Sequence, residues 1–299
     1  MGDTRRVYER PPSLVPAWVR AVAAGSKKTP SDLASVAFPR LEHELWPTKA
    51  EPKVLARYRR LCGFVDGPWL PVTFPQVMAG ALHIHMLTDP EFPLPAAGVV
   101  HVRNVIEQRK PIGVDDAVHF ACHLEPARPT DKGIEIDLVT KATVHGELVW
   151  SSTITALARS PQVAKEKNAK VKGADPALPG AATTGAARST LVRVPEDTGR
   201  KYAAIAGDYN PIHLHATTAK LFGFPRAIVH GMWSLARCVA ECEDDLPPGG
   251  MRLDCQFRRP VFLPTTAVFE AVHDGDGVRF ALRSKDGATL HLTATAVPT

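Results

Sequence analysis

Apolar and polar residues alternate along the last fifty residues of the chain, which predicts a series of strands. In VRFALRS and TLHLTATAV, apolar residues recur at every second position, a spacing typical of a strand with one buried face. Asp274-Gly275 and Asp286-Gly287 fall between the apolar stretches and are strong signals for tight hairpin turns. We therefore expect antiparallel strands over residues 251–257, 266–273, 278–284 and 289–297.

The first half of the chain repeats this organisation. The helical spacing of apolar residues in PQVMAGALHIHMLT predicts a helix over 75–88, and the corresponding helix of the second half is expected over 229–241. In each half a helix and a sheet can bury their apolar faces against one another, which makes an α+β unit. The strands expected in the first half span residues 98–107, 117–124, 134–144 and 148–159.

The two halves also match in sequence at a nearly constant offset. RKPIGVDDAVHF begins at Arg109, and RRPVFLPTTAVF begins 149 residues later at Arg258. RYRRLCG at 57–63 matches KYAAIAG at 201–207. Because these matches occur in the same order in both halves, we interpret the chain as an internal duplication.

Segments of different composition separate the two repeats and precede the first. Residues 160–189 are rich in Lys and then in Ala, Gly, Pro and Thr without hydrophobic periodicity, which indicates a linker. PSLVPAWVRAVAAG predicts a helix near the N-terminus. The expected segments are an N-terminal helical extension at 1–40, a first repeat at 41–159, the linker at 160–189 and a second repeat at 190–299.

Composition and charge narrow the class of protein. The chain has 299 residues, of which 44% are hydrophobic, enough for a sizeable core. The net charge is +5, but Lys and Arg are scattered, so nucleic acid is not an expected partner. The five cysteines form no CxxC pair, which suits free thiols in a reducing compartment. No run of about 18 apolar residues is present, so we expect no membrane span and a cytoplasmic location.

One segment of the second repeat concentrates polar residues in apolar surroundings. It reads YAAIAGDYNPIHLHATTAKLFGFPRAIVHGMW, from Tyr202 to Trp233. Pro211 disfavours a helical conformation at Asn210 and ends the preceding helix there. The resulting turn can bring Asp208 and His213 to one point, which a continuous helix would not do at this spacing. A carboxylate and an imidazole that flank one water can perform both proton transfers of a hydration.

This segment resembles the signature of the MaoC-like, R-specific enoyl-thioester hydratases, also called hydratase 2. The resemblance rests on Tyr202-(x)4-Gly207-Asp208-x-Asn210-Pro211-Ile212-His213, and FGFPRAIVHGMW is similar to the family's run into the central helix of a hotdog fold. The first half resembles the degenerate repeat of double-hotdog members. The whole layout is similar to bacterial 3-hydroxyacyl-thioester dehydratases of actinobacterial type. The implied fold is a double hotdog, two repeats in which antiparallel sheet wraps a helix.

The resemblance implies R-specific hydration of trans-2-enoyl thioesters, or dehydration of (R)-3-hydroxyacyl thioesters, in fatty acid metabolism. It implies that Asp208 and His213 activate the water and that Asn210 supports them. The Gly231 amide at a helix N-terminus is the expected oxyanion donor. No cofactor or metal is expected, because the substrate carries CoA or the phosphopantetheine of acyl carrier protein. Substrate contacts are expected from residues near this motif, namely Tyr209, His230, Met232, Trp233 and Arg258.

Other interpretations of the same residues stay open from the sequence. Asp208 with His213, His215 and His230 could form a metal cluster, since His-x-His is a known ligand spacing. The motif context argues against it and leaves His215 as a loop residue. His83 and His85 lie on different faces of their helix and are expected to be structural. A hotdog acyl-thioesterase and a non-catalytic acyl-thioester-binding subunit are the alternative functions.

The duplication has a consequence for the number of active sites. Aligning RYRRLCG with KYAAIAG places Phe64 opposite Asp208 and Trp69 opposite His213. The first repeat therefore lacks the catalytic pair, and we expect one active site in each chain. A repeat without this pair could make room for a long acyl chain, which is a hypothesis. Two repeats already form a pseudo-dimer, so both a monomer and a homodimer are compatible with the sequence.

Overall fold

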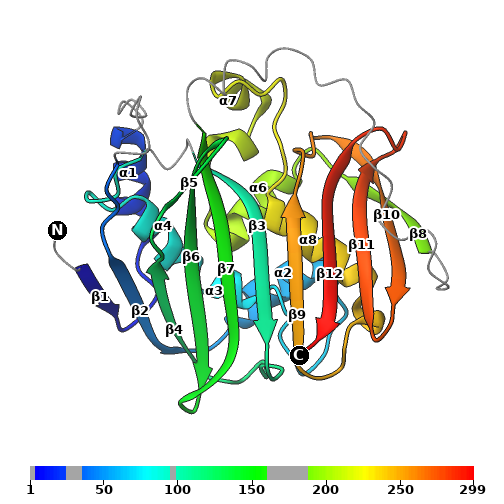
Figure 1. Cartoon of the computed structure of the whole chain (residues 1–299), viewed down its shortest axis with the longest axis horizontal. Helices are drawn as coiled ribbons and strands as arrows, with labels where there is room; N and C mark the ends of the chain where they lie inside the picture. The colour runs from blue at the N-terminus through cyan, green and yellow to red at the C-terminus, as the bar shows by residue number, and fades with distance from the viewer. Residues whose placement is uncertain (1–3, 25–35, 95–98, 160–187) are drawn as a thin grey trace.

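The two halves of the chain share one continuous, largely antiparallel sheet (Figure 1). The computed structural model describes residues 4–24, 36–94, 99–159 and 188–299. Within these residues the sheet has twelve strands in the order β1-β2-β4-β6-β7-β3-β9-β12-β11-β10-β8, and β5 pairs with β6 beside this path. All pairings between neighbouring strands are antiparallel except that of β1 with β2.

The first half contributes the strands and helices from the N-terminus to the predicted linker. Its strands are β1 (Thr4–Tyr8), β2 (Leu41–Thr48), β3 (Val99–Gln108), β4 (Val118–Leu124), β5 (Arg128–Thr130), β6 (Gly133–Val144) and β7 (Glu147–Arg159). Its helices are α1 (Leu14–Ala24), α2 (Pro52–Cys62), α3 (Pro75–Met78) and α4 (Gly80–Leu87).

The second half repeats this arrangement in a smaller set of elements. Its strands are β8 (Arg188–Val194), β9 (Met251–Phe257), β10 (Thr265–Asp274), β11 (Gly277–Ser284) and β12 (Leu290–Pro298). Its helices are α6 (Thr198–Ala206), α7 (Ala216–Leu221) and α8 (Gly231–Glu241), with short 3₁₀ helices η2 (Pro211–His213) and η3 (Glu243–Asp245).

A pseudo-twofold relation between the halves follows from the strand order. The order β2-β4-β6-β7-β3 in the first half corresponds to β8-β10-β11-β12-β9 in the second, and β1 is an additional edge strand beside β2. The halves meet where β3 pairs antiparallel with β9, with Asn104 opposite Cys255. The duplication predicted from the sequence therefore reappears as two similar units that join edge to edge.

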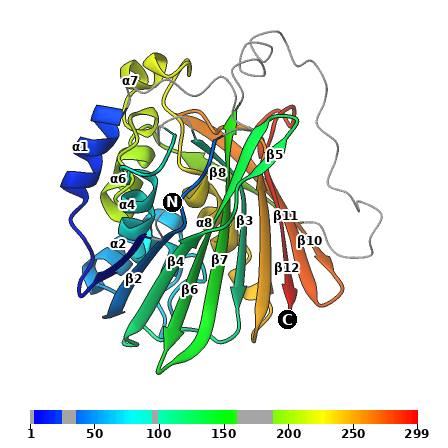
Figure 2. The same ribbon diagram turned by 60° about the vertical axis from the view of Figure 1, so that its left-hand side comes forward.

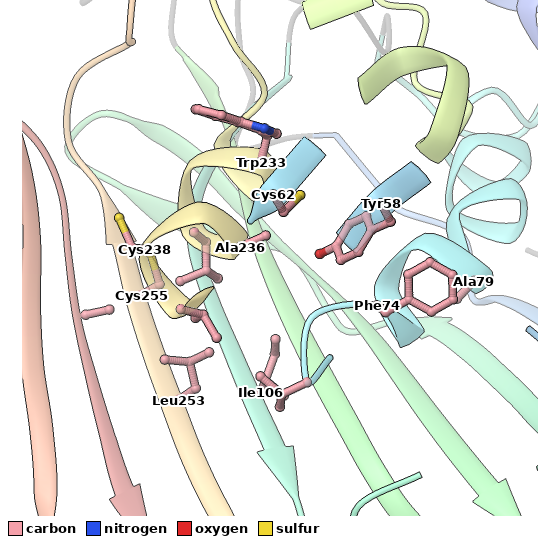
Figure 3. Packing of buried hydrophobic residues seen from close by; sticks show 14 of the residues in the cluster. Tyr58, Cys62, Phe74, Ala79, Ile106, Trp233, Ala236, Cys238, Leu253 and Cys255 are labelled. Atoms are coloured by element: carbon pink, nitrogen blue, oxygen red, sulfur yellow. The ribbon is translucent and has the colours of Figure 1, made fainter. Parts of the chain in front are cut away.

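The helices of both halves lie against the same face of the sheet (Figure 2). Leu253 and Cys255 of β9 pack beside Ala236 and Cys238 of α8 in the shared core (Figure 3). In the first half, the indole N–H of Trp150 on β7 donates to the Val72 carbonyl at 2.8 Å. This bond ties the sheet to the chain that leads into the helices. A sheet with one apolar face and the helices that cover it thus form one core.

Most predicted elements agree with the structure, and the differences have local causes. The helix expected over 75–88 is divided at Ala79 into α3 and α4. The helix expected from residue 229 begins at Gly231, because the Val229 N–H donates to the Val261 carbonyl at 3.0 Å and Ile228 bridges to Phe262. These two residues are held in extended backbone and cannot join the helix.

The sequence suggested a purely helical N-terminal extension, but the structure also contains a strand there. Residues Thr4–Tyr8 form strand β1, which pairs parallel with β2. This strand was not predicted because TRRVY has little apolar alternation and depends on a partner about forty residues later. Of the predicted linker at 160–189, residues 160–187 lie outside the described residues, and Arg188 and Ser189 already belong to β8. None of the described helices is long and apolar enough to cross a membrane.

The alignment of Trp69 with His213 is wrong, because the β-bridges of the two halves make Trp69 equivalent to Ile228. Gly63 and Gly207 both end a helix with a positive φ, at 89° and 75°. The next equivalent point is a β-bridge, Trp69 to Gly113 in the first half and Ile228 to Phe262 in the second. Six positions separate Gly63 from Trp69, whereas 21 separate Gly207 from Ile228. The first half therefore lacks about 15 residues that carry the polar motif.

Candidate active site

The polar motif occupies the loop between α6 and α8. The Asp208 Oδ1 accepts a hydrogen bond from the Asn210 N–H at 3.2 Å, and the Asn210 Oδ1 accepts one from the Ile212 N–H at 3.4 Å. Asn210 has φ −55° and ψ 125°, an extended conformation that Pro211 favours in the preceding residue. These local bonds fold Asp208 back towards the η2 turn, as the sequence predicted. Asn210 thereby has a supporting position in the loop.

The His213 ring is buried and held in one orientation. Its Nδ1 lies 2.9 Å from the Ile228 carbonyl oxygen and therefore donates a hydrogen bond to it. In a neutral ring the proton then resides on Nδ1, so Nε2 carries a lone pair and can accept a proton. The side chain is one wall of a cleft that Asp208 and Gly231 also line.

His230 belongs to the same cluster, where the sequence predicted a substrate contact and left a metal ligand open. Its ring stacks on that of His213 with centroids 3.7 Å apart. Its Nε2 lies 2.9 Å from the Asp208 carbonyl oxygen and 3.7 Å from the Asp208 carboxylate. The signal for this role was the position of His230 directly before Gly231, where α8 begins. Only the packing of the loop on α8 brings the two rings together.

The electrostatic surroundings keep both histidine rings neutral. Burial lowers the pKa of His213, and the nearby Asp208 charge offsets part of this effect. Burial, followed by the neighbouring His213, lowers the pKa of His230 to about 3. A ring with a lowered pKa is unprotonated at neutral pH and can act as a base.

Acid should destabilise the fold because several histidines are buried without charge. Their pKa values lie below the usual 6.5 of the unfolded chain, so the unfolded chain binds more protons and stability is lost as pH falls below 6.5. We expect the free energy of unfolding to fall by several kcal/mol in total between pH 7 and pH 5, as measured by denaturant titration. The rings concerned are His43 and His101, with pKa about 4, and His83 and His230, with pKa about 3.

A pair of variants tests the cause of this acid sensitivity. His43 is fully buried, and burial is the largest cause of its lowered pKa. Replacing His43 by leucine should therefore lessen the loss of stability on acidification. Replacing the exposed His215 by leucine should leave that loss unchanged. Equal pH dependence in both variants would contradict the explanation.

Gly231 is the first residue of α8 and lines the cleft. Within the described residues, the N-cap residue His230 makes no side-chain hydrogen bond to the first turn of the helix. A Cβ at Gly231 would lie 3.1 Å from the Phe257 ring, so glycine permits a close approach to the backbone here. Amides in the first turn lack acceptors within the helix and attract negative charge. This position fits the predicted oxyanion donor.

Three of the other predicted substrate contacts line the cleft, and one does not. Tyr209, Met232 and Arg258 face it. Tyr209 also contacts Trp18 edge to face, with centroids 6.4 Å apart, and the Trp18 N–H donates to the Gly207 carbonyl at 3.2 Å. Trp18 lies on α1, so the N-terminal extension covers one side of the loop. The sequence carried no signal for this contact.

Trp233 was predicted to contact substrate, and the structure places it in the core instead. Its side chain is 2% exposed, and its indole N–H donates to the Leu61 carbonyl at 3.2 Å (Figure 3). Successive residues on a helix point about 100° apart, so Met232 faces the cleft while Trp233 turns towards α2. Trp233 therefore joins the two halves rather than binding a ligand.

Replacing Trp233 by phenylalanine should lower stability without changing substrate affinity. The variant removes the indole N–H and leaves the part-buried Leu61 carbonyl without this donor, which costs about 1–3 kcal/mol. Denaturant unfolding measures the loss, and KM for an enoyl thioester should stay at the wild-type value. A raised KM at unchanged stability would return Trp233 to the substrate site.

The structure also bears on a metal at this position. Among the described residues, the groups with ligand spacing are Asp208, His213 and His230, whose ligand atoms lie within 4.8 Å of one another. His215 of the His-x-His pair is exposed at the start of α7 and is not part of this set. The stacked rings are only 26° from parallel, and a tetrahedral ion requires lone pairs that converge. Each ring is hydrogen-bonded to a backbone carbonyl, that of Ile228 or of Asp208, so the arrangement suits two stacked, anchored rings better than a metal centre.

Comparison with known proteins identifies relatives along most of the chain. A family model described as the MaoC like domain matches residues 163–295. The 3-hydroxyacyl-thioester dehydratase X of Mycobacterium tuberculosis is 33% identical over 245 residues, which cover 82% of this chain and 85% of that protein. The peroxisomal enoyl-CoA hydratase 2 of Arabidopsis thaliana is 34% identical over 89 residues, 27% of this chain and 28% of that protein.

The fold agrees with these sequence relations. The crystal structure of HtdX of Mycobacterium tuberculosis matches with a TM-score of 0.73 and 31% identity, and the match covers 86% of this chain and 100% of that one. The predicted α+β double hotdog is thereby confirmed. Identity of one third across both repeats, with the Asp208–His213 turn at the cleft, means that the chain belongs to the MaoC-like dehydratase family.

Proposed function

We propose that the chain catalyses the reversible, R-specific hydration of trans-2-enoyl thioesters, the reverse of (R)-3-hydroxyacyl-thioester dehydration. The observation that carries this proposal is the placement of Asp208, the free Nε2 of His213 and the first amide of α8 along one cleft. Hydration needs a base for water, a proton for C2 and a donor for the thioester oxygen. These three groups can supply them.

In the proposed mechanism, the Asp208 carboxylate holds a water against His213. Nε2 of His213 removes one proton as the water oxygen forms its bond to C3, and the electron pair of the C2=C3 bond moves towards the thioester carbonyl. The imidazolium then returns that proton to C2 on the same face. One water is consumed and both side chains return to their initial states. The neutral ring required at the start agrees with the lowered pKa of His213.

The negative charge that develops on the thioester oxygen requires a donor that is already in place. We assign this role to the Gly231 N–H at the N-terminus of α8. A preorganised donor of this kind typically lowers the barrier by about 3 kcal/mol. The proposed mechanism uses no cofactor, because His213 performs both proton transfers while Asp208 holds the water.

The finer identity of the substrate is also part of the proposal. Apolar residues such as Val77, Ile84 and Leu87 line the cleft beyond the catalytic groups, which suits an acyl chain carried by CoA or acyl carrier protein. All five cysteines are buried free thiols, which supports a reducing, cytoplasmic location. The joined halves can act as a monomer, and a homodimer is equally compatible.

Hydration of crotonyl-CoA and dodecenoyl-CoA tests the proposed function. The expected result is loss of the conjugated enoyl absorbance, with the R enantiomer of the 3-hydroxyacyl product identified by chiral analysis. Release of free thiol with the double bond intact would instead indicate a thioesterase. Binding without turnover of either substrate would indicate a non-catalytic acyl-thioester-binding protein.

A further inference from the structure

The cleft continues from the catalytic loop into the first half of the chain. Its far end lies between α3 and α4 on one side and β3 and β7 on the other. Apolar side chains form most of this end, including Val77, Ile84 and Ile154. Polar side chains also line this end, and those from α3, α4 and the start of β3 include Gln76, His83 and His101.

These polar side chains are buried and only partly satisfied. Gln76 and His83 are 6% and 7% exposed. The Gln76 Nε2 lies 3.2 Å from His83 Nδ1, and His83 Nε2 lies 2.8 Å from the Thr140 hydroxyl. The Gln76 Oε1 and the His101 Nε2 are buried and have no hydrogen-bond partner among the described residues. Buried polar atoms almost always have partners, so each of these two atoms can pair with a polar group that enters the cleft.

The elements that carry these polar residues pack directly on the segments of the catalytic site. Gly80, between Gln76 and His83 in the sequence, packs so closely on α6 that a Cβ there would lie 2.9 Å from the Ala206 carbonyl oxygen. Ala206 precedes Asp208 by two residues. The His101 ring packs against Phe257 with centroids 4.8 Å apart. Phe257 in turn lies against Gly231, so the Phe257 ring separates His101 from the proposed oxyanion donor.

The charge of the polar end restricts what it can bind. Burial lowers the pKa of His83 to about 3 and that of His101 to about 4, and Gln76 is neutral. A carboxylate would therefore meet no cationic side chain among these three. A hydroxyl group both donates and accepts, so it can pair with the Gln76 amide and with His101 in either tautomer. An unsubstituted alkyl chain would leave both atoms unpaired.

We propose that the end of the cleft formed by Gln76, His83 and His101 binds a hydroxyl group on the acyl chain. The preferred substrate is then a trans-2-enoyl thioester that carries a hydroxyl beyond C3. This inference rests on the proposed hydratase function and specifies its substrate class. The apolar walls around the polar atoms accommodate the methylene groups between the hydroxyl and the reacting double bond.

The test compares octenoyl-CoA with analogues that carry one hydroxyl at C5, C6, C7 or C8. We expect at least one hydroxylated analogue to be hydrated with a kcat/KM about tenfold or more above that of octenoyl-CoA. A site that is built to pair with a substrate hydroxyl disfavours the analogue without it by such factors or greater. If none of the analogues exceeds octenoyl-CoA, the inference is overturned.

Two variants locate the preference at the proposed residues. Gln76→Met keeps the side-chain volume but removes the amide, and it should bring the ratio of kcat/KM values close to one. Ile84→Val changes the same cleft without changing its polarity, and it should preserve the wild-type ratio. A ratio that survives in Gln76→Met, or that falls equally in Ile84→Val, would overturn the assignment.

Binding to a slow variant gives a second measurement that does not depend on Gln76→Met folding. In Asp208→Asn, calorimetry should show tighter binding of the preferred hydroxylated substrate than of octenoyl-CoA. Equal affinities would argue against the inference. Crotonyl-CoA distinguishes failure of this inference from failure of the proposed function, because its acyl chain is too short to reach the polar end. Hydration of crotonyl-CoA without any hydroxyl preference overturns only this inference, whereas absence of hydration overturns the proposed function as well.

Discussion

Replacing Asp208 by asparagine should lower kcat/KM for hydration by about 10²–10⁴-fold. Asparagine keeps an oxygen that can accept the hydrogen bond from the Asn210 N–H, so the loop retains its shape. It loses the negative charge that would orient the water and stabilise the imidazolium of His213. His213→Ala should cause a loss of similar size, because no other group in the proposed mechanism removes the proton from water. Steady-state hydration of crotonyl-CoA measures both effects.

The double variant and a matched control distinguish catalysis from folding. Residues that act as a unit are strongly non-additive, so Asp208→Asn combined with His213→Ala should lose little more than either change alone. Asp276→Asn makes the same chemical change at an exposed turn between β10 and β11 and should behave as wild type. Hydration that is indifferent to both catalytic changes would refute the assignment of this pair.

Replacing Gly199 by alanine should lower kcat by about 100-fold, although Gly199 does not line the cleft. Gly199 lies on α6, where an added Cβ would overlap the carbonyl oxygen of His213. This carbonyl belongs to the backbone of the η2 turn, so the turn must move and carry the imidazole with it. Displacement of a catalytic group by about 1 Å can cost about 10²-fold in rate. Overpacking of this kind also destabilises a protein by about 1–3 kcal/mol.

Gly67→Ala is the control for this substitution, because a Cβ at Gly67 meets no atom within 4 Å. It should preserve both kcat and the midpoint of thermal unfolding. Gly199→Ala should shift both, and its effect on kcat should exceed its effect on KM because the substrate route is not obstructed. Wild-type kinetics in Gly199→Ala would mean that the η2 turn can move without loss of function.

Features set by residues close together in the chain could be predicted from the sequence. Alternation and the Asp-Gly turns located β9 to β12 within one or two residues, because side chains of a strand face opposite sides at every step. The bend that brings Asp208 towards His213 depends on Asn210 and Pro211, which act on the neighbouring backbone. The family resemblance depended on the same short segment.

Features set by contacts between distant segments required the folded chain. His230 meets His213 because Ile228 is held by Phe262, 34 residues later, in a bridge that fixes the start of α8. Trp233 points away from the cleft because α2, from the other repeat, covers that side of α8. The first half has fewer residues between Gly63 and Trp69 than the second half has between Gly207 and Ile228. This difference was identified from equivalent β-bridges in the structure, because the two sequences are not similar there. The polar end of the cleft combines Gln76, His83 and His101 from α3, α4 and β3. The spacing of these residues in the sequence could not predict this grouping, because it depends on how the helices pack on the sheet.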